Sequence, residues 1–339
     1  MDLTATNIVI ATGAKPHPLP GNPFAGALID STQALEVNEF PSSAVIIGAG
    51  AIALEFASMW NAAGSKVTLL IRKDRVLSAW DRRAGTTLTR ELKRHGVNII
   101  TRASVTHVDT GANLGATVHY TREGQDGEQS VWGEIALVAI GRDPITDPAW
   151  GVTIDDHGHV ATDAYGRTDK PGVWAVGDVT AGHALAHRAF EQGIVIAETI
   201  AGLNPKPVDE ATVPQIVFSF PEAASVGLTV EQAQAREDLV EIKETNYPML
   251  ANARMLMSGT AGSLTIVSGC DAANPDTPRV LGVHMVSQMA SDIIAEAEQL
   301  VGNHVPLADA ARLVHPHPTF SETLGEALLK ADGRPLHTR

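Results

Sequence analysis

The stretch HPHPTFSE, residues 315–322, holds the side chains of a general base together with an orienting acid. Two histidines each precede a proline, and Glu322 follows His317 by five residues. An imidazole exchanges protons near neutral pH, and a carboxylate on its second nitrogen fixes the tautomer and raises its basicity. The stretch therefore predicts an acid–base pair, with one of the two histidines as the base.

A helix cap is a second interpretation of the same residues. Thr319-x-x-Glu322 precedes the helical pattern FSETLGEALLK, and this spacing forms a capping box at a helix start. The two interpretations are compatible, because a rigid helix start can hold a base and Pro318 restricts His317 to extended backbone. We expect no metal site from His315 and His317, because no third ligand has suitable spacing.

The segment AVIIGAG, followed by AIALEFASMWNAAG, predicts a strand, a tight turn and a helix. Gly48 permits the turn, Gly50 lets the backbone approach a pyrophosphate, and Ala53 lets the helix pack on the strand. The helix start then donates amides to phosphates. A close-packed turn without a ligand is the alternative. The predicted dinucleotide contacts are Gly48, Ala49, Gly50, Ala51, Ile52 and Ala53.

The end of the next strand, KVTLLI, bears on the choice of coenzyme. NAD-preferring sites carry Asp or Glu at this position, whereas the chain has Ile71 followed by Arg72 and Lys73. Loss of the carboxylate and gain of cations favour a 2′-phosphate, so the sequence favours NADPH. A solvated charge cluster at a strand end is the alternative.

The order of elements is typical of an α/β protein. Strands and helices alternate from residue 44 to about 101, which predicts a βαβαβ unit with a parallel sheet. Residues 104–132 alternate and are rich in turns, so we expect a small antiparallel flap there. NIVIATG predicts a strand at residues 8–11 that needs neighbours on both sides. After the proline-rich linker GLNPKPVDEATVP, the chain reads as an α+β domain.

Composition narrows the classes of function. The 339 residues carry a formal charge of −14, which argues against a nucleic-acid surface. The sequence contains no run of eighteen apolar residues, so it predicts no membrane span. Cys270 is the only cysteine, so no internal disulfide can form, which suits the cytoplasm. The polar segment SGCDAANPDTPR predicts an exposed loop with Cys270 as a solvated thiol.

The chain resembles the flavin-dependent pyridine nucleotide–disulfide oxidoreductases over nearly its whole length. The resemblance lies in the order of ATG, GAGAIALE, IGRDPIT, GVWAVGDVT, LAHRAFEQG, VPQIVFSFPEAASVGLT and HPHPTFSETLGEAL. LAHRA and the ending HPHPTFSE…GRPLHT look most like dihydrolipoamide dehydrogenases. By contrast, GAGAIA…LLIRKDRVL is similar to glutathione reductase and its NADPH-using relatives.

The resemblance implies a Rossmann-type NAD(P) domain inserted in a partial FAD-binding domain, followed by an α+β dimerisation domain. The expected boundaries are 1–41 for the partial FAD-binding segment, 42–145 for the NAD(P) domain, 146–211 for the return of the FAD domain and 212–339 for the dimerisation domain. A homodimer formed through this last domain is implied, as is a lipoyl-type dithiol substrate.

The resemblance also assigns roles to single residues. Asp178 of GVWAVGD would hydrogen-bond the ribityl chain of FAD, although a turn or cap aspartate is the alternative. Glu55 would lie near the nicotinamide. Val105 and Gly141 would line the NAD(P) site, although a core strand residue and a turn glycine explain them almost as well. The other expected FAD contacts are Ala11, Thr12, Gly13, Ala184, Leu185, Ala186 and His187.

In the family, the histidine of HPT is the base that deprotonates a dithiol, which implies His317 with Glu322 as its partner. A thiol becomes a good nucleophile only when deprotonated, so dithiol oxidation needs such a base. In family members this histidine reaches the disulfide of the other subunit. His315 is the less favoured base.

The resemblance places a C-x4-C redox disulfide and a first FAD-binding glycine motif upstream of ATG, and this chain has neither. We therefore expect an N-terminally truncated chain that alone neither retains FAD nor oxidises dihydrolipoamide. Two alternatives stay open. One is a non-catalytic NAD(P)H-binding chain that dimerises, and the other is a fragment of a glutathione- or mercuric-type NADPH reductase.

Overall fold

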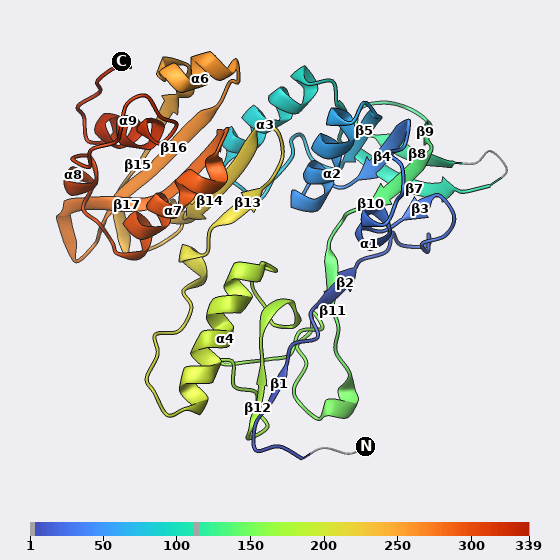
Figure 1. Cartoon of the computed structure of the whole chain (residues 1–339), viewed down its shortest axis with the longest axis horizontal. Helices are drawn as coiled ribbons and strands as arrows, with labels where there is room; N and C mark the ends of the chain where they lie inside the picture. The colour runs from blue at the N-terminus through green and yellow to red at the C-terminus, as the bar shows by residue number, and fades with distance from the viewer. Residues whose placement is uncertain (1–3, 112–114, 339) are drawn as a thin grey trace. The chain divides into compact units, whose positions relative to one another are not determined.

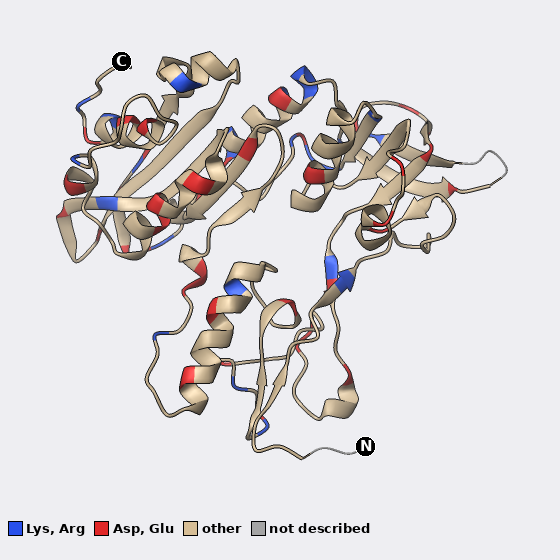
Figure 2. Cartoon of the chain, viewed as in Figure 1, with Lys and Arg blue, Asp and Glu red and all other residues tan. Residues whose placement is uncertain are grey.

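Two segments far apart in the sequence, Met1–His17 and Gly141–Val213, make up the first of two compact units in the computed structural model. The second unit comprises Pro18–Ile140 and Pro214–Arg339 (Figure 1). The structure describes residues 4–111 and 115–338. Figure 2 shows that the Asp and Glu residues, which give the chain its net negative charge, are spread over both units.

Short paired strands hold the first unit together. β1 (Ile8–Ile10) runs parallel to β12 (Val173–Ala175), and β2 (Ala14–Pro16) runs antiparallel to β11 (Arg142–Pro144). Because β1 has only one neighbouring strand within residues 4–111 and 115–338, Ile8 and Val9 remain 52% and 44% exposed. The remaining elements are η1 (Pro148–Trp150), η2 (Gly177–Val179), α4 (Ala186–Ile200) and η3 (Glu210–Thr212).

A parallel five-stranded sheet, in the order β3-β10-β4-β5-β6, forms the centre of the first half of the second unit. Its strands are β3 (Leu28–Ile29), β4 (Ser43–Ile47), β5 (Lys66–Ile71), β6 (Asn98–Thr101) and β10 (Ile135–Val138). The helices are α1 (Ser31–Leu35), α2 (Ala51–Ala62) and α3 (Arg82–Arg94). The expected βαβαβ order is therefore confirmed.

The two faces of this sheet are covered differently. Phe56 and Trp60 of α2 pack with Leu88 of α3 and with Ile46 and Leu69 of the sheet in one core. Met59, in the same helix, is 41% exposed. The other core joins the sheet to an antiparallel layer made of β7 (Ala103–Asp109), β8 (Ala116–Arg122) and β9 (Gln129–Gly133). This layer is the expected flap, and it buries one of its faces.

A second five-stranded sheet, antiparallel and in the order β13-β14-β17-β16-β15, organises the rest of the second unit. Its strands are β13 (Gln215–Val217), β14 (Glu222–Gly227), β15 (Leu239–Pro248), β16 (Ser263–Asp271) and β17 (Asn274–Ser287). The helical elements are α5 (Val230–Gln234), η4 (Met249–Ala251), α6 (Ala253–Ser258), α7 (Ala290–Gly302), α8 (Leu307–Ala310) and α9 (Glu322–Ala331). One apolar core spans this sheet together with α7 and α9.

The prediction that Cys270 lies in an exposed loop is wrong. Cys270 lies in β16 opposite Val240, and only 3% of it is exposed. Burial raises the pKa of its thiol, so the reactive thiolate is disfavoured. Most of the polar residues that suggest a loop belong to the exposed first half of β17, which pairs with β16 in a hairpin.

None of the helices within the described ranges combines the length and apolar composition needed to cross a membrane.

Candidate functional site

The turn between β4 and α2 requires glycine at position 48. Gly48 has φ +143°, a conformation that L side chains rarely adopt. A Cβ atom there would lie 2.1 Å from the Ala139 carbonyl oxygen and 3.4 Å from the Ala53 Cβ. The small residue expected at position 53 therefore packs against the turn, as the glycine motif requires.

The start of α2 faces open space at Gly50. A Cβ atom on Gly50 would meet no protein atom within 4 Å, so a ligand can approach the backbone closely at this point. The first intrahelical hydrogen bond runs from the Leu54 N–H to the Gly50 carbonyl, which leaves the amides of Ala51, Ile52 and Ala53 unpaired within the helix. The first turn has no acidic residue. These features fit the pyrophosphate of a dinucleotide.

The strand end next to this turn is cationic. Ile71 is the last residue of β5 and is buried, whereas Arg72 is exposed. No hydrogen bond or ion pair engages the Arg72 side chain anywhere in residues 4–111 and 115–338. An unpaired guanidinium suits a phosphate, because its fork of N–H groups matches phosphate oxygens.

Glu55 lies one turn further along α2 and is already engaged. Its Oε1 accepts a hydrogen bond of 3.0 Å from the Phe218 backbone N–H. Burial raises the pKa of the Glu55 carboxyl, and this hydrogen bond offsets only part of the effect. The role of Glu55 near a nicotinamide stays a prediction, because its observed hydrogen-bond partner is a backbone N–H.

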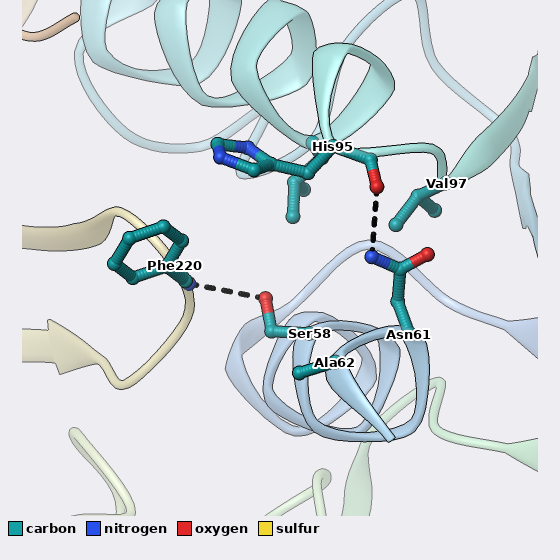
Figure 3. Close-up of a pocket in the computed structure, with 7 residues that line it drawn as sticks. Ser58, Asn61, Ala62, His95, Val97 and Phe220 are labelled. Atoms are coloured by element: carbon teal, nitrogen blue, oxygen red, sulfur yellow. Dashed lines mark hydrogen bonds between the residues drawn. The ribbon is translucent and has the colours of Figure 1, made fainter. Parts of the chain in front are cut away.

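A small hollow of about 140 Å³ lies beyond Glu55, at the far end of α2 (Figure 3). Its lining is mostly apolar, with His95 and Phe220 in edge-to-face contact at 5.2 Å. The Phe220 N–H donates to Ser58 Oγ at 3.1 Å, and Asn61 Nδ2 donates to the His95 carbonyl at 2.9 Å. These bonds tie α2 to neighbouring segments, and the hollow lies away from the glycine turn and is too small for a dinucleotide.

Val105 and Gly141 stay predictions as NAD(P) contacts. Val105 lies in β7 and packs partly buried against the sheet core, which agrees with the core-strand alternative. Gly141 has φ +142° and its carbonyl accepts from the His17 N–H at 3.0 Å, which agrees with a turn glycine.

The residues expected near FAD lie in the first unit. Asp178 sits in η2, and within the described residues its carboxylate makes no hydrogen bond or ion pair. The preceding Gly177 is held by its N–H, which donates to Gln192 Oε1 at 2.9 Å. A partly buried carboxylate without a protein partner fits a ligand hydroxyl.

Helix α4 begins beside the expected flavin-facing backbone. Leu185 is its N-cap without a side-chain cap, and Ala186 and His187 form its exposed first turn, which carries no acidic residue. Ala184 precedes it and is exposed. The positive end of the helix dipole at such a helix start favours negative charge.

The segment Ala11, Thr12 and Gly13 follows β1. The Thr12 hydroxyl donates to the Ile145 carbonyl at 2.7 Å, and the Ile145 N–H donates to the Gly13 carbonyl at 2.9 Å. Gly13 has φ +70°, and a Cβ atom placed on it would meet no protein atom within 4 Å. The segment thus presents open backbone.

His317 and Glu322 meet as the sequence predicts. His317 Nδ1 lies 2.8 Å from Glu322 Oε1, and the His317 side chain is 72% exposed. Because an ionised carboxylate only accepts, Nδ1 carries the proton and Nε2 is left as the proton acceptor. The geometry is that of an oriented imidazole base facing solvent.

Glu322 divides its two oxygens between the predicted roles. Its Oε2 accepts from the Thr319 N–H at 2.7 Å, and its own N–H donates to Thr319 Oγ1 at 3.4 Å. The two reciprocal hydrogen bonds of a capping box therefore join Thr319 and Glu322, although the N-cap of α9 itself is Ser321, which has no side-chain cap. Burial raises the pKa of Glu322, but the Thr319 amide and the His317 ring outweigh it, so the pKa lies below its ordinary value.

His315 serves a different purpose. Its side chain is 9% exposed, and Nε2 lies 3.0 Å from Glu296 Oε1. The hydrogen bond to Glu296 raises its pKa, although burial opposes this. A Cβ on Gly325 would meet His315 Nδ1 at 2.3 Å, so the ring packs flush on α9. His315 therefore anchors the segment and is not a free base.

Sequence reasoning missed a neighbouring group on the next turn of α9. Glu326 accepts from His337 Nδ1 and from the buried Tyr247 hydroxyl. Burial raises the pKa of the Tyr247 hydroxyl, and the negative charges of Glu326 and Glu322 raise it further. The spacing of Glu322 and Glu326 places both carboxylates on one helix face, which is the signal that could have revealed the group.

Comparison with known proteins gives consistent matches. The family model described as pyridine nucleotide-disulphide oxidoreductase matches residues 1–193, and the model of the dimerisation domain of that family matches residues 213–328. A dihydrolipoyl dehydrogenase of Cupriavidus necator is 37% identical over 341 residues, covering 99% of this chain and 70% of that protein. A dihydrolipoyl dehydrogenase of Bacillus subtilis is 36% identical with the same coverage.

Solved structures agree with these matches. LpdA from Mycobacterium tuberculosis has a TM-score of 0.84 at 27% identity, covering 96% of this chain and 69% of that one. The HOCl-induced flavoprotein disulfide reductase RclA from Escherichia coli has a TM-score of 0.82 at 27% identity, covering 95% and 73%. The predicted fold class is confirmed.

The shared carboxylate yields a pH-dependent prediction. Because the pKa of Glu322 is lowered in the folded chain, its ionised form stabilises the fold above the ordinary carboxyl pKa, and this contribution is lost as pH falls through the lowered value. We expect His317→Gln to raise the pKa of Glu322 towards its ordinary value, as measured by carboxyl ¹³C NMR titration. Glu237→Gln, an exposed change elsewhere, serves as the control and should leave Glu322 unaffected. An unchanged Glu322 titration in His317→Gln would refute the pairing.

Proposed function

The chain belongs to the pyridine nucleotide-disulphide oxidoreductase family, and we propose that it acts as a dihydrolipoyl dehydrogenase-like flavoprotein. Such an enzyme passes electrons between a dithiol, FAD and a pyridine nucleotide. Oxidation of a dithiol to a disulfide also releases protons, so a base must stand at the thiol. The His317–Glu322 pair is the observation that carries the proposal.

His317 supplies the base through its exposed Nε2. Glu322 holds the other nitrogen at 2.8 Å, and the resulting imidazolium would be stabilised by the adjacent carboxylate when a thiol proton is accepted. Glu322 itself stays ionised because the Thr319 amide and the His317 ring lower its pKa despite burial. These residues would therefore hold and release a proton without rearranging the helix start.

The chain's own residues support both cofactor sites. Gly48, Gly50 and the unpaired amides of α2 would bind the pyrophosphate of NAD(P), and Arg72 supports a preference for the 2′-phosphate of NADPH. Asp178 and the start of α4 would bind FAD, which supplies the two-electron redox chemistry when bound. No acidic side chain in the first turn of either helix opposes an anionic ligand.

Residues 1–339 cannot themselves supply a dithiol for this reaction. Cys270 is the only cysteine and is 3% exposed with a raised pKa, so it offers neither a disulfide partner nor a reactive thiolate. This observation also supports a second candidate function, a chain that binds NAD(P)H without turning over a dithiol.

We further propose a homodimer and a cytoplasmic location. The dimerisation-domain match and several exposed apolar side chains in the second unit support the homodimer, among them Leu256, Met257 and Val314, which are 61%, 74% and 95% exposed. The presence of a single, unpaired cysteine supports a reducing compartment.

The coenzyme preference can be tested on the chain by calorimetry or nucleotide fluorescence. Arg72→Glu should weaken NADPH binding about 10- to 100-fold, because a charge-assisted contact to the 2′-phosphate is lost, and should change NADH binding little. Arg83→Glu, an exposed change of the same charge in α3, should weaken neither. Equal weakening of both coenzymes by Arg72→Glu would contradict the proposed phosphate contact.

The proposed base is best tested in a protein that also contains the redox-active thiols. We would join residues 1–339 to the part of the Cupriavidus necator relative that has no counterpart in this chain, and measure NAD(P)⁺ reduction by dihydrolipoamide. His317→Gln should lower kcat by about 10²- to 10⁴-fold while nucleotide binding is retained. His157→Gln is the control for loss of an exposed histidine. A folded, FAD-loaded chimera that does not turn over would count against the function and favour the second candidate.

The oligomeric state is open to light scattering. We expect twice the chain mass of 35.7 kDa, and a charged substitution at Met257 should shift the protein towards monomer if this side chain lies in the interface. A monomer at micromolar concentration in the unaltered chain would overturn the proposed homodimer.

A further inference from the structure

Two histidines lie stacked on the antiparallel layer β7–β9, far along the chain from the acid–base pair. The rings of His107 and His119 have centroids 4.0 Å apart and an interplanar angle of 9°. They are direct cross-strand partners in the β7–β8 ladder. Both strands lie in the second unit (Figure 1).

The alternation of β8 explains why these rings face solvent. Ala116, Val118 and Tyr120 are buried against the parallel sheet, so His119, between Val118 and Tyr120, points to the other face. A register shift between Val105 and His107 brings His107 opposite His119. The two imidazoles therefore share the outer face of the layer.

Two carboxylates flank the stacked rings on opposite edges. Asp109 Oδ2 lies 3.1 Å from His119 Nε2 and 3.9 Å from His107 Nε2. Glu128 lies on the Nδ1 edge, at 3.6 Å from His119 and 3.8 Å from His107. Thr106 Oγ1 donates to Glu128 Oε1 at 2.7 Å, which fixes this second carboxylate in place.

This arrangement has the parts of a metal site. One donor atom each from His107, Asp109 and His119 lies within 4.8 Å of the others. Tetrahedral ligands at about 2.0–2.2 Å from a zinc ion stand roughly 3.3 Å apart, so the His119–Asp109 spacing already fits and the His107–Asp109 spacing must close by about half an ångström. Metal-bound imidazoles usually donate their other N–H to a carboxylate. Glu128 lies on that edge at 3.6 and 3.8 Å from the two Nδ1 atoms, so it must move closer to accept these hydrogen bonds.

We infer that His107, Asp109 and His119 form a binding site for a divalent transition-metal ion such as Zn²⁺ or Cu²⁺, with Glu128 orienting the two imidazoles through Nδ1. The donor set of two imidazoles and one carboxylate selects these ions over Mg²⁺ or Ca²⁺, which prefer oxygen ligands. Water would complete the coordination, because three protein donors leave a fourth position.

Binding requires a small movement of the rings. Parallel stacked imidazoles direct their Nε2 lone pairs side by side, so the rings must turn towards each other to share one ion. His107 is 46% exposed and His119 22%, so side-chain rotation meets little steric resistance at His107. The inference is independent of the proposed function, since none of these four residues belongs to the acid–base pair or the glycine turn.

Surface ion pairing is the competing explanation, because exposed histidines often lie near carboxylates without binding metal. The first unit contains a matched example. His159 Nδ1 lies 3.3 Å from Asp155 Oδ2, with a similar exposure of 26% for the histidine side chain. It offers one imidazole and one carboxylate without a second histidine, so its loss should not affect a two-histidine site.

Calorimetric titration of the untagged, metal-free chain with Zn²⁺ alone tests the inference. We expect one strong equivalent, and His107→Gln or His119→Gln should each weaken it at least about 10-fold, because a ligand is lost. His159→Gln should leave the affinity unchanged. Cu²⁺ bound to the unaltered chain should show nitrogen hyperfine splitting from two imidazoles in its EPR spectrum.

The opposing results are equally defined. Absence of Zn²⁺ binding, or binding that neither histidine variant weakens, would overturn the site, as would equal weakening by His159→Gln. Circular dichroism and NADPH affinity check that each variant folds. If either histidine variant fails this check, Asp109→Asn replaces it, and unchanged Zn²⁺ affinity in that variant would also overturn the site.

Discussion

The pairing of β2 with β11 is the constraint on which the discontinuous organisation of the chain depends. These strands lie more than one hundred residues apart in sequence, and residues 18–140 between them belong to the second unit. Beyond the ladder, His17 Nδ1 lies 2.7 Å from Asp143 Oδ1, and the Thr12 hydroxyl donates to the Ile145 carbonyl. The entropic cost of closing a loop rises only slowly with loop length. A few local hydrogen bonds therefore suffice to hold together the two strands at which the chain leaves the first unit and returns to it.

Local steric rules explain which parts of the molecule could be predicted from sequence. Gly48 must be glycine because its φ and the Ala139 carbonyl exclude a side chain, and that requirement is readable in the motif. The predicted exposure of Cys270 is wrong because the polar residues near it indicate an exposed segment but do not reveal that the β16–β17 strand pairing continues through it. The pairing of His107 with His119 depends on a register shift in β7, and sequence periodicity alone does not reveal such a shift.

The Glu322 carboxylate shows how a structural role and a proposed chemical role can coexist in one residue. One oxygen satisfies the Thr319 amide at the start of α9, and the other orients His317. Because the same helix start that needs the carboxylate also fixes its position, the imidazole is oriented by an interaction that stabilises the fold. Neither role would keep its geometry if the carboxylate moved.

His315 and His317 differ in chemistry although they are two residues apart on the segment before α9. His315 is directed inward, where Glu296 and Gly325 immobilise it, whereas His317 is left exposed. The buried ring thus fixes the segment from which the exposed ring projects. His317, the proposed base, has Glu322 as its only hydrogen-bond partner among the described residues, so the group that it would deprotonate must approach from outside. This follows from the geometry of the pair itself and agrees with the absence of a reactive thiol among the described residues, where the only cysteine is buried in β16.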